Sequence, residues 1–187
     1  LLKSKEIFFS FKISTSDSNI IFHLKYFSLS IIHTMSIQDN FRLAMRRYIY
    51  SVSIMSSKDD GYLNAITVSS VTSISMDPPS LLICINKSAR IHDTLRIGSK
   101  FCINLLNKDQ ENLSNICSDE DSYDERFKDK NWNTKGVPFL ANAQANIFCK
   151  VDKLSSYHTH TIVVGLVQDA NYSDEISTLT YVDGNYK

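Results

Sequence analysis

Residues 80–90 read Ser80-Leu81-Leu82-Ile83-Cys84-Ile85-Asn86-Lys87-Ser88-Ala89-Arg90, and this stretch decides the fold class. Its first part is apolar at successive positions and follows the stiff corner Asp77-Pro78-Pro79. That pattern is typical of a β-strand covered on both faces. The strand leads into a predicted helix at residues 88–97, with Ser88 as its cap and Gly98 at its end.

The end of this stretch also carries candidate ligands for an anion. Asn86, Lys87, Ser88, Ala89 and Arg90 combine a strand end, the unpaired N–H groups of a helix start, a hydroxyl and two cations. Such a set can bind a phosphate without a glycine-rich loop. An ordinary helix cap, with Lys87 and Arg90 in water, explains the same residues equally well.

The flanking sequence predicts antiparallel strands. Tyr50, Val52 and Ile54 alternate toward Asp60-Gly61, a dipeptide that favours a hairpin turn into a second strand at residues 62–69. Further strands are predicted at residues 100–106, 145–151, 161–168 and 178–182, and further helices at residues 37–48 and 108–117. About seven short strands with inserted helices indicate a mainly β fold, an antiparallel barrel rather than a doubly wound sheet.

The amino-acid composition excludes several classes of binding site and of protein. The 187 residues carry 20 basic and 20 acidic side chains, so the positive field that nucleic-acid or anionic-membrane binding usually needs is missing. The five glycines stand apart, which excludes GxGxxG and GxxxxGK loops. The four cysteines form no CxxC pair, and no apolar run is long enough to span a membrane. We therefore expect a soluble, cytoplasmic protein with reduced thiols.

The first 34 residues differ from the rest of the chain. They contain no Gly, Pro or Arg and show no lasting helical or strand period. Met35 directly precedes Ser36-Ile37-Gln38-Asp39, which resembles a helix-starting capping box. We predict an N-terminal extension at residues 1–34 and one domain at residues 35–187. A mitochondrial targeting segment is the alternative for the extension.

Two other places in the sequence could carry chemistry. Thr67, Val68, Ser69 and Ser70 form a hydroxyl-rich strand end, which a solvated strand edge also explains. His158 and His160 would share one face of a strand and could offer two metal ligands. No third ligand has suitable local spacing, so a solvated or hydrogen-bonded pair is favoured and no metal is predicted.

An ordered set of short motifs resembles the flavin reductase family of FMN-binding split barrels. The set runs from Phe41-Arg42-x-Ala44-Met45 through Asp60-Gly61 and Thr67-Val68-Ser69-Ser70 to Gly184-x-Tyr186. No single motif is specific, but their order covers nearly the whole domain. The resemblance implies an antiparallel split β-barrel of the FMN-binding type and an NAD(P)H:flavin oxidoreductase.

The resemblance also implies roles for residues and partners. FMN, or FAD, would lie at a homodimer interface, with its ring against the Thr67–Ser70 backbone and its phosphate near residues 86–90. His160 would position the nicotinamide of NADH or NADPH, and the reduced flavin would serve a flavin-dependent monooxygenase. Hydride transfer from nicotinamide to flavin depends on alignment and exclusion of water more than on a side-chain acid or base.

The chain departs from the family pattern at three places. Ser51 and Ala65 stand where glycines are frequent, and each adds a Cβ to the backbone. The frequent Gly-Asp-His appears as His158-Thr159-His160. These departures keep two alternatives open: a split barrel that binds flavin or haem without turnover, and a flavoprotein that holds FMN tightly and reduces another substrate.

Overall fold

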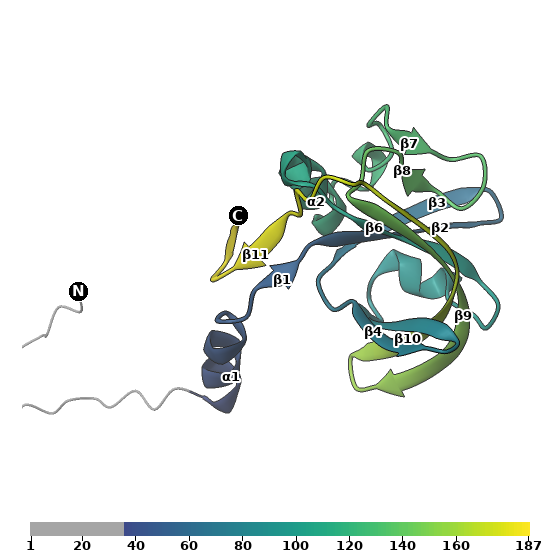
Figure 1. Cartoon of the computed structure of the whole chain (residues 1–187). Helices are drawn as coiled ribbons and strands as arrows, with labels where there is room; N and C mark the ends of the chain where they lie inside the picture. Colours follow the sequence, from purple (N-terminus) through teal and green to yellow (C-terminus); the bar gives the residue numbers. More distant parts are fainter. Residues whose placement is uncertain (1–35) are drawn as a thin grey trace, which may run out of the picture. The chain divides into compact units, whose positions relative to one another are not determined.

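The computed structural model describes residues 36–187 (Figure 1). The chain divides into a unit that ends at Asn40 and a unit that comprises Phe41–Lys187. Helix α1 (Ile37–Met45) begins as predicted, because the Ser36 hydroxyl accepts a 3.1 Å hydrogen bond from the N–H of Asp39. The predicted extension at residues 1–34 lies outside the described residues.

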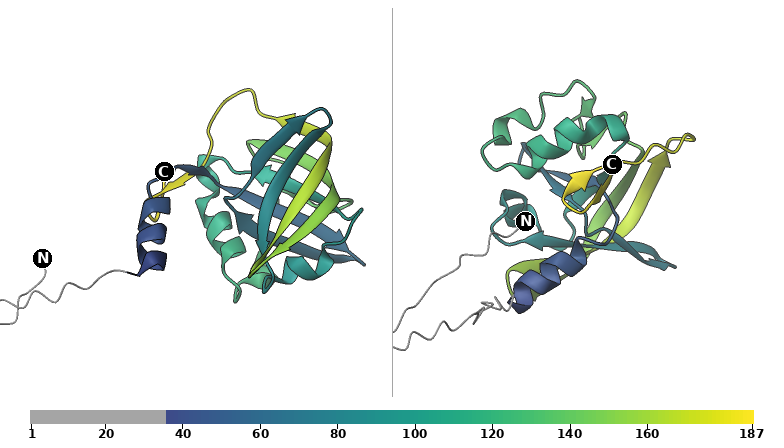
Figure 2. Two further views of the ribbon diagram at one scale, coloured as in Figure 1. Left: turned by 90° about the horizontal axis from the view of Figure 1, so that it is seen from below. Right: turned by 90° about the vertical axis from the view of Figure 1, so that its left-hand side faces the viewer.

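One antiparallel sheet of seven strands forms most of the second unit, in the order β3-β2-β6-β9-β10-β5-β4. Its strands are β2 (Ser53–Asp59), β3 (Tyr62–Val68), β4 (Thr72–Met76), β5 (Pro79–Asn86), β6 (Lys100–Leu105), β9 (Ala145–Tyr157) and β10 (His160–Tyr172). The strands lie side by side in a curved sheet (Figure 2, left). The edge strands β3 and β4 follow one another in the chain but do not pair with each other. The predicted mainly β, antiparallel fold is confirmed.

Turn chemistry sets the register of the hairpins. Asp60 and Gly61 have φ values of 46° and 88°, which closes the predicted β2–β3 hairpin with Asp59 opposite Tyr62. Strands β9 and β10 are longer than predicted, and strand β4 was not predicted. The helix predicted at residues 88–97 is wrong: a 3₁₀ helix η1 (Arg90–Thr94) stands there, with Ala89 and not Ser88 at its N-cap position.

Short elements complete the chain. Strands β1 (Tyr50–Ser51), β11 (Thr180–Val182) and β12 (Asn185–Tyr186) form one small sheet, and β7 (Trp132–Asn133) and β8 (Phe139–Leu140) form another. The predicted helix at residues 108–117 consists of the 3₁₀ helix η2 (Lys108–Gln110) and α2 (Glu111–Ser118), and η3 (Tyr123–Glu125) follows. None of the helices between residues 36 and 187 is long and apolar enough to cross a membrane.

Two apolar clusters stabilise this arrangement. The first contains Ile83, Phe101 and Val163 on the sheet, and the second contains Ile54 and Leu113, where α2 packs on the sheet. Fully burying each such side chain contributes about 1.5–3 kcal/mol. The first cluster also explains why position 165 is a glycine, because a Cβ there would lie 2.6 Å from the ring of Phe101.

Candidate functional site

A pocket of about 290 Å³ opens where three strands meet, at the ends of β3 and β5 and the start of β10. Its lining residues are Ile66, Thr67, Val68, Ser69, Ser70, Cys84, Ile85, Asn86 and His160. The sheet order separates β3 from β5 along the hydrogen-bonded ladder, so the curvature of the sheet brings them together. Thus Thr67, Val68, Ser69, Ser70, Asn86 and His160, all singled out from sequence, lie around one pocket.

Ser70 keeps the β3–β4 connection beside β5. Its hydroxyl accepts a hydrogen bond from the N–H of Cys84 at 3.1 Å and donates to the Cys84 carbonyl at 3.3 Å. Pairing of β3 with β2 ends at Val68, and pairing of β4 with β5 begins at Thr72. The peptide groups around Ser69 and Ser70 therefore line the pocket at a break in the sheet.

The hydroxyl of Thr67 has a structural partner. It donates to the carbonyl of Ser114 in α2 at 2.7 Å, which ties that helix to the end of β3. The Thr67 and Ser70 hydroxyls are thus bound to the protein, and this wall offers a ligand its backbone groups and the exposed side chain of Ser69.

Asn86 and His160 line the same pocket from two neighbouring strands. They are partners in the β5–β10 ladder. The Asn86 carboxamide oxygen accepts a hydrogen bond from the N–H of Ser88 at 3.1 Å, and His160 Nδ1 lies 2.9 Å from the hydroxyl of Thr159. His160 is exposed and lines the pocket, so its imidazole is accessible to a ligand there.

The remaining predicted anion ligands lie elsewhere. The amine of Lys87 donates to the hydroxyl of Ser156 in β9 and to the carbonyl of His158 in the β9–β10 turn, and the guanidinium of Arg90 lies 4.4 Å from the centre of the Tyr123 ring. Ser88 and Ala89 donate their N–H groups to Asn86, at 3.1 Å each. None of these four residues lines the pocket. Their interactions were not predictable from local sequence, because the partners of Lys87 and Arg90 are distant along the chain.

The predicted shared face of His158 and His160 is wrong. His158 lies in the turn between β9 and β10 with a φ of 45°, whereas His160 begins β10. Among residues 36–187 no group of three or more His, Cys, Asp and Glu side chains is placed to hold a metal ion.

Burial makes three of the thiols poor nucleophiles. It raises the pKa of Cys149 to about 12, and it raises the pKa of Cys117 to about 12 despite the opposing charge of Arg126. The pKa of Cys102 is raised as well, by burial and then by Cys149. All four cysteines are free, as predicted, and only Cys84 lines the pocket.

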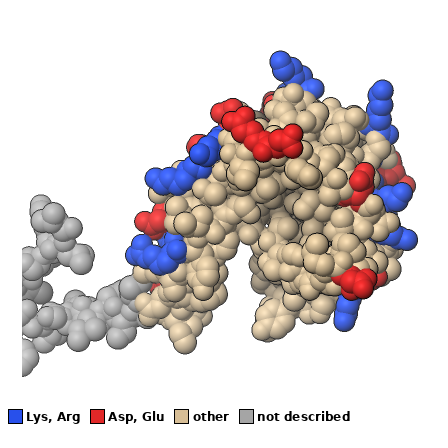
Figure 3. All heavy atoms as spheres, viewed as in Figure 1, with Lys and Arg blue, Asp and Glu red and all other residues tan. Residues whose placement is uncertain are grey.

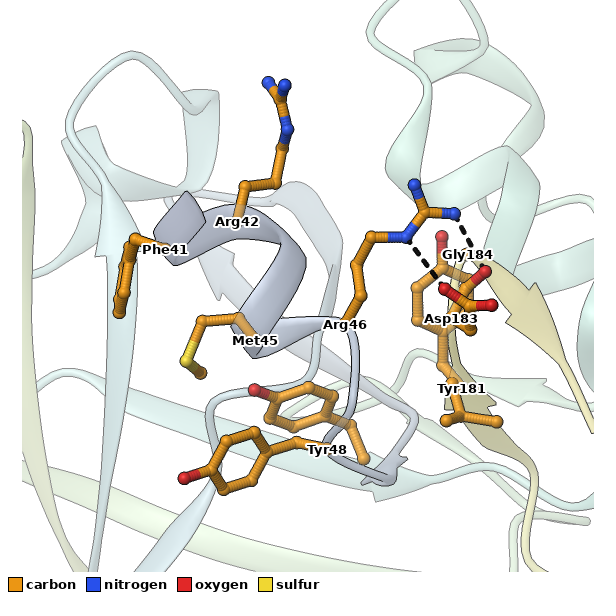
Figure 4. Close-up of a pocket in the computed structure, with 10 residues that line it drawn as sticks. Phe41, Arg42, Met45, Arg46, Tyr48, Tyr181, Asp183 and Gly184 are labelled. Atoms are coloured by element: carbon orange, nitrogen blue, oxygen red, sulfur yellow. Dashed lines mark hydrogen bonds and ion pairs between the residues drawn. The ribbon is translucent and has the colours of Figure 1, made fainter. Parts of the chain in front are cut away.

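A second pocket, of about 370 Å³, was not predicted (Figure 4). It is lined by Phe41, Arg42, Met45, Arg46, Tyr48, Tyr50, Tyr181, Val182, Asp183 and Gly184. Arg46 closes one side, with its Nε 3.2 Å from the Asp183 carboxylate and its terminal nitrogen donating to the Asp183 carbonyl at 2.9 Å. The spacing of Phe41, Met45 and Tyr48 in the predicted amphipathic helix was the available signal for this apolar surface.

On the one face drawn in Figure 3, charge does not mark a binding surface. Basic and acidic side chains are interspersed on the face drawn in Figure 3, in keeping with the zero formal net charge. The residues that line the first pocket include no Lys, Arg, Asp or Glu, so recognition there depends on local shape and hydrogen bonding.

Comparison with known proteins connects this geometry to a family. The model of the flavin reductase like domain matches residues 45–187. The reductase component of an FADH2-dependent resorcinol hydroxylase from Rhizobium sp. MTP-10005 is 35% identical over 164 residues, which cover 86% of this chain and 92% of that protein. The FMN reductase (NADH) RutF of Pantoea ananatis is 31% identical over 151 residues, 80% of each chain.

Solved structures agree with the sequence matches. A candidate flavin reductase from Haemophilus somnus 129PT superposes with a TM-score of 0.76 at 29% identity, covering 82% of this chain and 99% of the other. The sequence resemblance is thereby confirmed. The chain belongs to the flavin reductase-like domain family.

Proposed function

We propose that this protein is an NAD(P)H:flavin oxidoreductase that reduces FMN or FAD and supplies the reduced flavin to another enzyme. The observation that carries the proposal is the first pocket, which gathers the Thr67–Ser70 segment, Asn86 and His160 in a chain of this family. The names of the relatives, an NADH-dependent FMN reductase and the reductase component of a hydroxylase, support it.

The pocket suits a flat heteroaromatic ring with one polar edge. Ile66 contributes a partly buried apolar side chain, the buried residues Val68 and Ile85 lie behind the pocket in the apolar core, and the Ser69–Ser70 backbone contributes peptide groups at the break in the sheet. Ligand sites of this kind combine mostly apolar walls with a few fixed polar groups. A bound flavin would supply the hydride acceptor. The proposed site residues for it are Thr67, Val68, Ser69, Ser70 and Asn86.

His160 is proposed to position the nicotinamide. It lines the pocket together with the Ser69–Ser70 connection, and it lies on a strand rather than in a loop. Hydride transfer gains mainly from holding donor and acceptor in a reactive alignment, and a residue on a paired strand provides a rigid contact for that purpose. A phosphate site at Lys87, Ser88, Ala89 and Arg90 remains a prediction; none of the four residues lines the pocket, and Lys87 and Arg90 have partners in the protein.

Steady-state oxidation of NADH and NADPH, with and without added FMN or FAD, tests the proposal. We expect oxidation that requires added flavin. Flavin binding without oxidation would instead identify the non-catalytic flavin- or haem-binding alternative, and FMN that stays bound through gel filtration would identify a flavoprotein with a resident cofactor.

We also propose a homodimer that delivers reduced flavin to a flavin-dependent monooxygenase. Phe41, Tyr48 and Ile49 have exposed fractions of 66%, 60% and 71%, and they surround or adjoin the apolar second pocket. Contiguous exposed apolar surface is typical of a protein–protein interface. A second copy of the chain is the occupant that we propose for it.

Residues 1–34, which lie outside the family match, are proposed to be dispensable for flavin binding.

A further inference from the structure

We infer that Lys87 is a positioning residue for His160: it holds the turn before β10 and so fixes the imidazole at the pocket. This inference rests on the proposed function, since His160 matters only if a nicotinamide is bound there. It replaces the anion-binding role that the sequence indicates for Lys87 with a different one.

Three hydrogen bonds from Lys87 hold the turn, and we refer to them as the Lys87 clamp. The amine donates to the carbonyl of His158 at 2.6 Å and to the hydroxyl of Ser156 at 2.7 Å, and the backbone N–H donates to the carbonyl of Thr159 at 2.9 Å. Hydrogen bonds from a charged amine are shorter and stronger than those between neutral groups. Lys87, which directly follows β5, therefore binds the carbonyls of both turn residues, His158 and Thr159.

The turn needs such support because of its backbone. His158 and Thr159 form a two-residue loop between the paired residues Tyr157 and His160. His158 has a φ of 45°, in the left-handed region of backbone conformation. Glycine adopts this region without strain, whereas a residue with a Cβ is strained there. A contact that holds the His158 carbonyl opposes relaxation of the loop out of this conformation.

The clamp reaches His160 through Thr159. The Thr159 carbonyl is bound by Lys87, and the Thr159 hydroxyl lies 2.9 Å from His160 Nδ1. Nδ1 is thus engaged by the turn, and Nε2 is the ring nitrogen that remains for a ligand in the pocket. Asn86, directly before Lys87, is the ladder partner of His160, so one strand end fixes both the backbone and the ring of the histidine.

The charge of Lys87 is not neutralised by a protein carboxylate. No acidic side chain between residues 36 and 187 forms an ion pair with its amine at 4.0 Å or less. Its two side-chain partners are neutral oxygens. An incoming phosphate could therefore compete with the turn for this amine, which makes a binding comparison between phosphorylated and unphosphorylated flavin the decisive experiment.

The main variant is Lys87→Met, which keeps the aliphatic stem and removes the amine. We expect kcat/KM for NAD(P)H to fall about tenfold, while the affinities for FMN and riboflavin, which lacks the phosphate, change in parallel by less than about threefold. Lys153→Met, which changes an exposed lysine of β9, is the matched control and should behave as wild type. If Lys87→Met weakens FMN tenfold and leaves riboflavin unchanged, Lys87 binds the phosphate and the inference is overturned.

A double-mutant cycle tests the connection to His160. Adding Lys87→Met to His160→Ala should cost little further activity if both act on the same step, because effects of residues that act as a unit are not additive. Fully additive losses would contradict the inference. Ser156→Ala removes one acceptor of the clamp, and it should give a smaller loss, about two- to threefold, in the same direction even if Lys87→Met folds poorly.

Hydrogen exchange separates failure of the clamp from failure of the proposed function. In the flavin-free protein, the amides of Thr159 and His160 should exchange at least about fivefold faster in Lys87→Met than in wild type. Unchanged exchange would overturn the clamp whatever the enzyme does. Faster exchange in a protein that oxidises no NAD(P)H at all would retain the clamp and reject the function.

Discussion

His160 occupies the first position of β10, where the ladder with β5 ends at Asn86 and the pocket begins. We expect His160→Ala to lower kcat/KM for NAD(P)H about ten- to a hundredfold, roughly 1.4–2.7 kcal/mol, because a lost positioning contact reduces the reactive alignment. Flavin affinity should change much less. Stopped-flow reduction and flavin titration measure the two effects separately.

The control for this variant removes the neighbouring imidazole. His158→Asn keeps the carbonyl that Lys87 binds and places a residue that tolerates positive φ in the turn. It should retain near wild-type activity. Equal losses of flavin binding and turnover in His160→Ala would assign the histidine to the flavin contact, and no loss in either would mean that it is a surface residue without a role.

At the scale of elements, the break between β3 and β4 depends on the Ser70 hydroxyl, which substitutes for a strand partner of Cys84. Ser70→Ala leaves the Cys84 N–H and carbonyl without this partner and frees the connection from β5. We expect flavin affinity to fall at least about fivefold and stability to fall by about 1 kcal/mol. Fluorescence titration and urea unfolding measure these changes. Ser73→Ala, exposed on β4, is the control.

How far sequence predicts the elements depends on whether their determinants are local. The Asp60-Gly61 turn and the apolar run of β5 carry their own signals, and the hairpin and the strand were both predicted correctly. The prediction that β5 is covered on both faces was wrong, because Leu82 and Cys84 are only partly buried. Strand β4 is mostly exposed and lies at the sheet edge, so its residues lack a buried alternation that would identify it. Residues 88–97 have helical spacing, but the chain becomes extended again at Leu95.

In the site, too, the residues with a local sequence signal were predictable and those with distant partners were not. The hydroxyl-rich segment at residues 67–70 and His160 could be selected from sequence, and the structure brings them together. The partners of Lys87 could not, because Ser156 and His158 are 69 and 71 positions away and become neighbours only when β5 pairs with β10. The sequence around Lys87 is therefore the same whether its amine binds an anion at a helix start or binds a turn that is distant along the chain.

For the whole molecule, the raised pKa values of the buried thiols predict a loss of stability in alkali. The folded chain keeps Cys117 and Cys149 protonated up to about pH 12, whereas the unfolded chain ionises them near 9. Stability is therefore full below pH 9 and declines above it, by about 1.4 kcal/mol for each thiol at pH 10. Urea unfolding at pH 8 and pH 10 measures the decline.

Other groups titrate in the same range, so the cysteines need their own comparison. A variant with Cys102→Ala, Cys117→Ala and Cys149→Ala should show a distinctly smaller decline between the two pH values, whatever its starting stability. An unchanged decline would mean that the thiols are not responsible.

The apolar surface at Phe41 and Tyr48 predicts the assembly state. Light scattering should give twice the mass of the chain for wild type, and Phe41→Ser with Tyr48→Ser should shift the protein to the single-chain mass. Tyr62→Ser removes a side chain that is 76% exposed on the β2–β3 hairpin and should leave the mass unchanged. A wild-type protein of single-chain mass would reject the proposed homodimer.

The short connection between β3 and β4 limits how a ligand can enter the first pocket. Val68 and Thr72, which end one strand and begin the next, are four peptide units apart, so even a fully stretched tether between them spans only roughly 14 Å. At that end, the edge strands β3 and β4 cannot move apart independently of each other. The length of this connection therefore limits how wide the first pocket can open, and we expect a planar ring to enter it without a large hinge motion of the two strands.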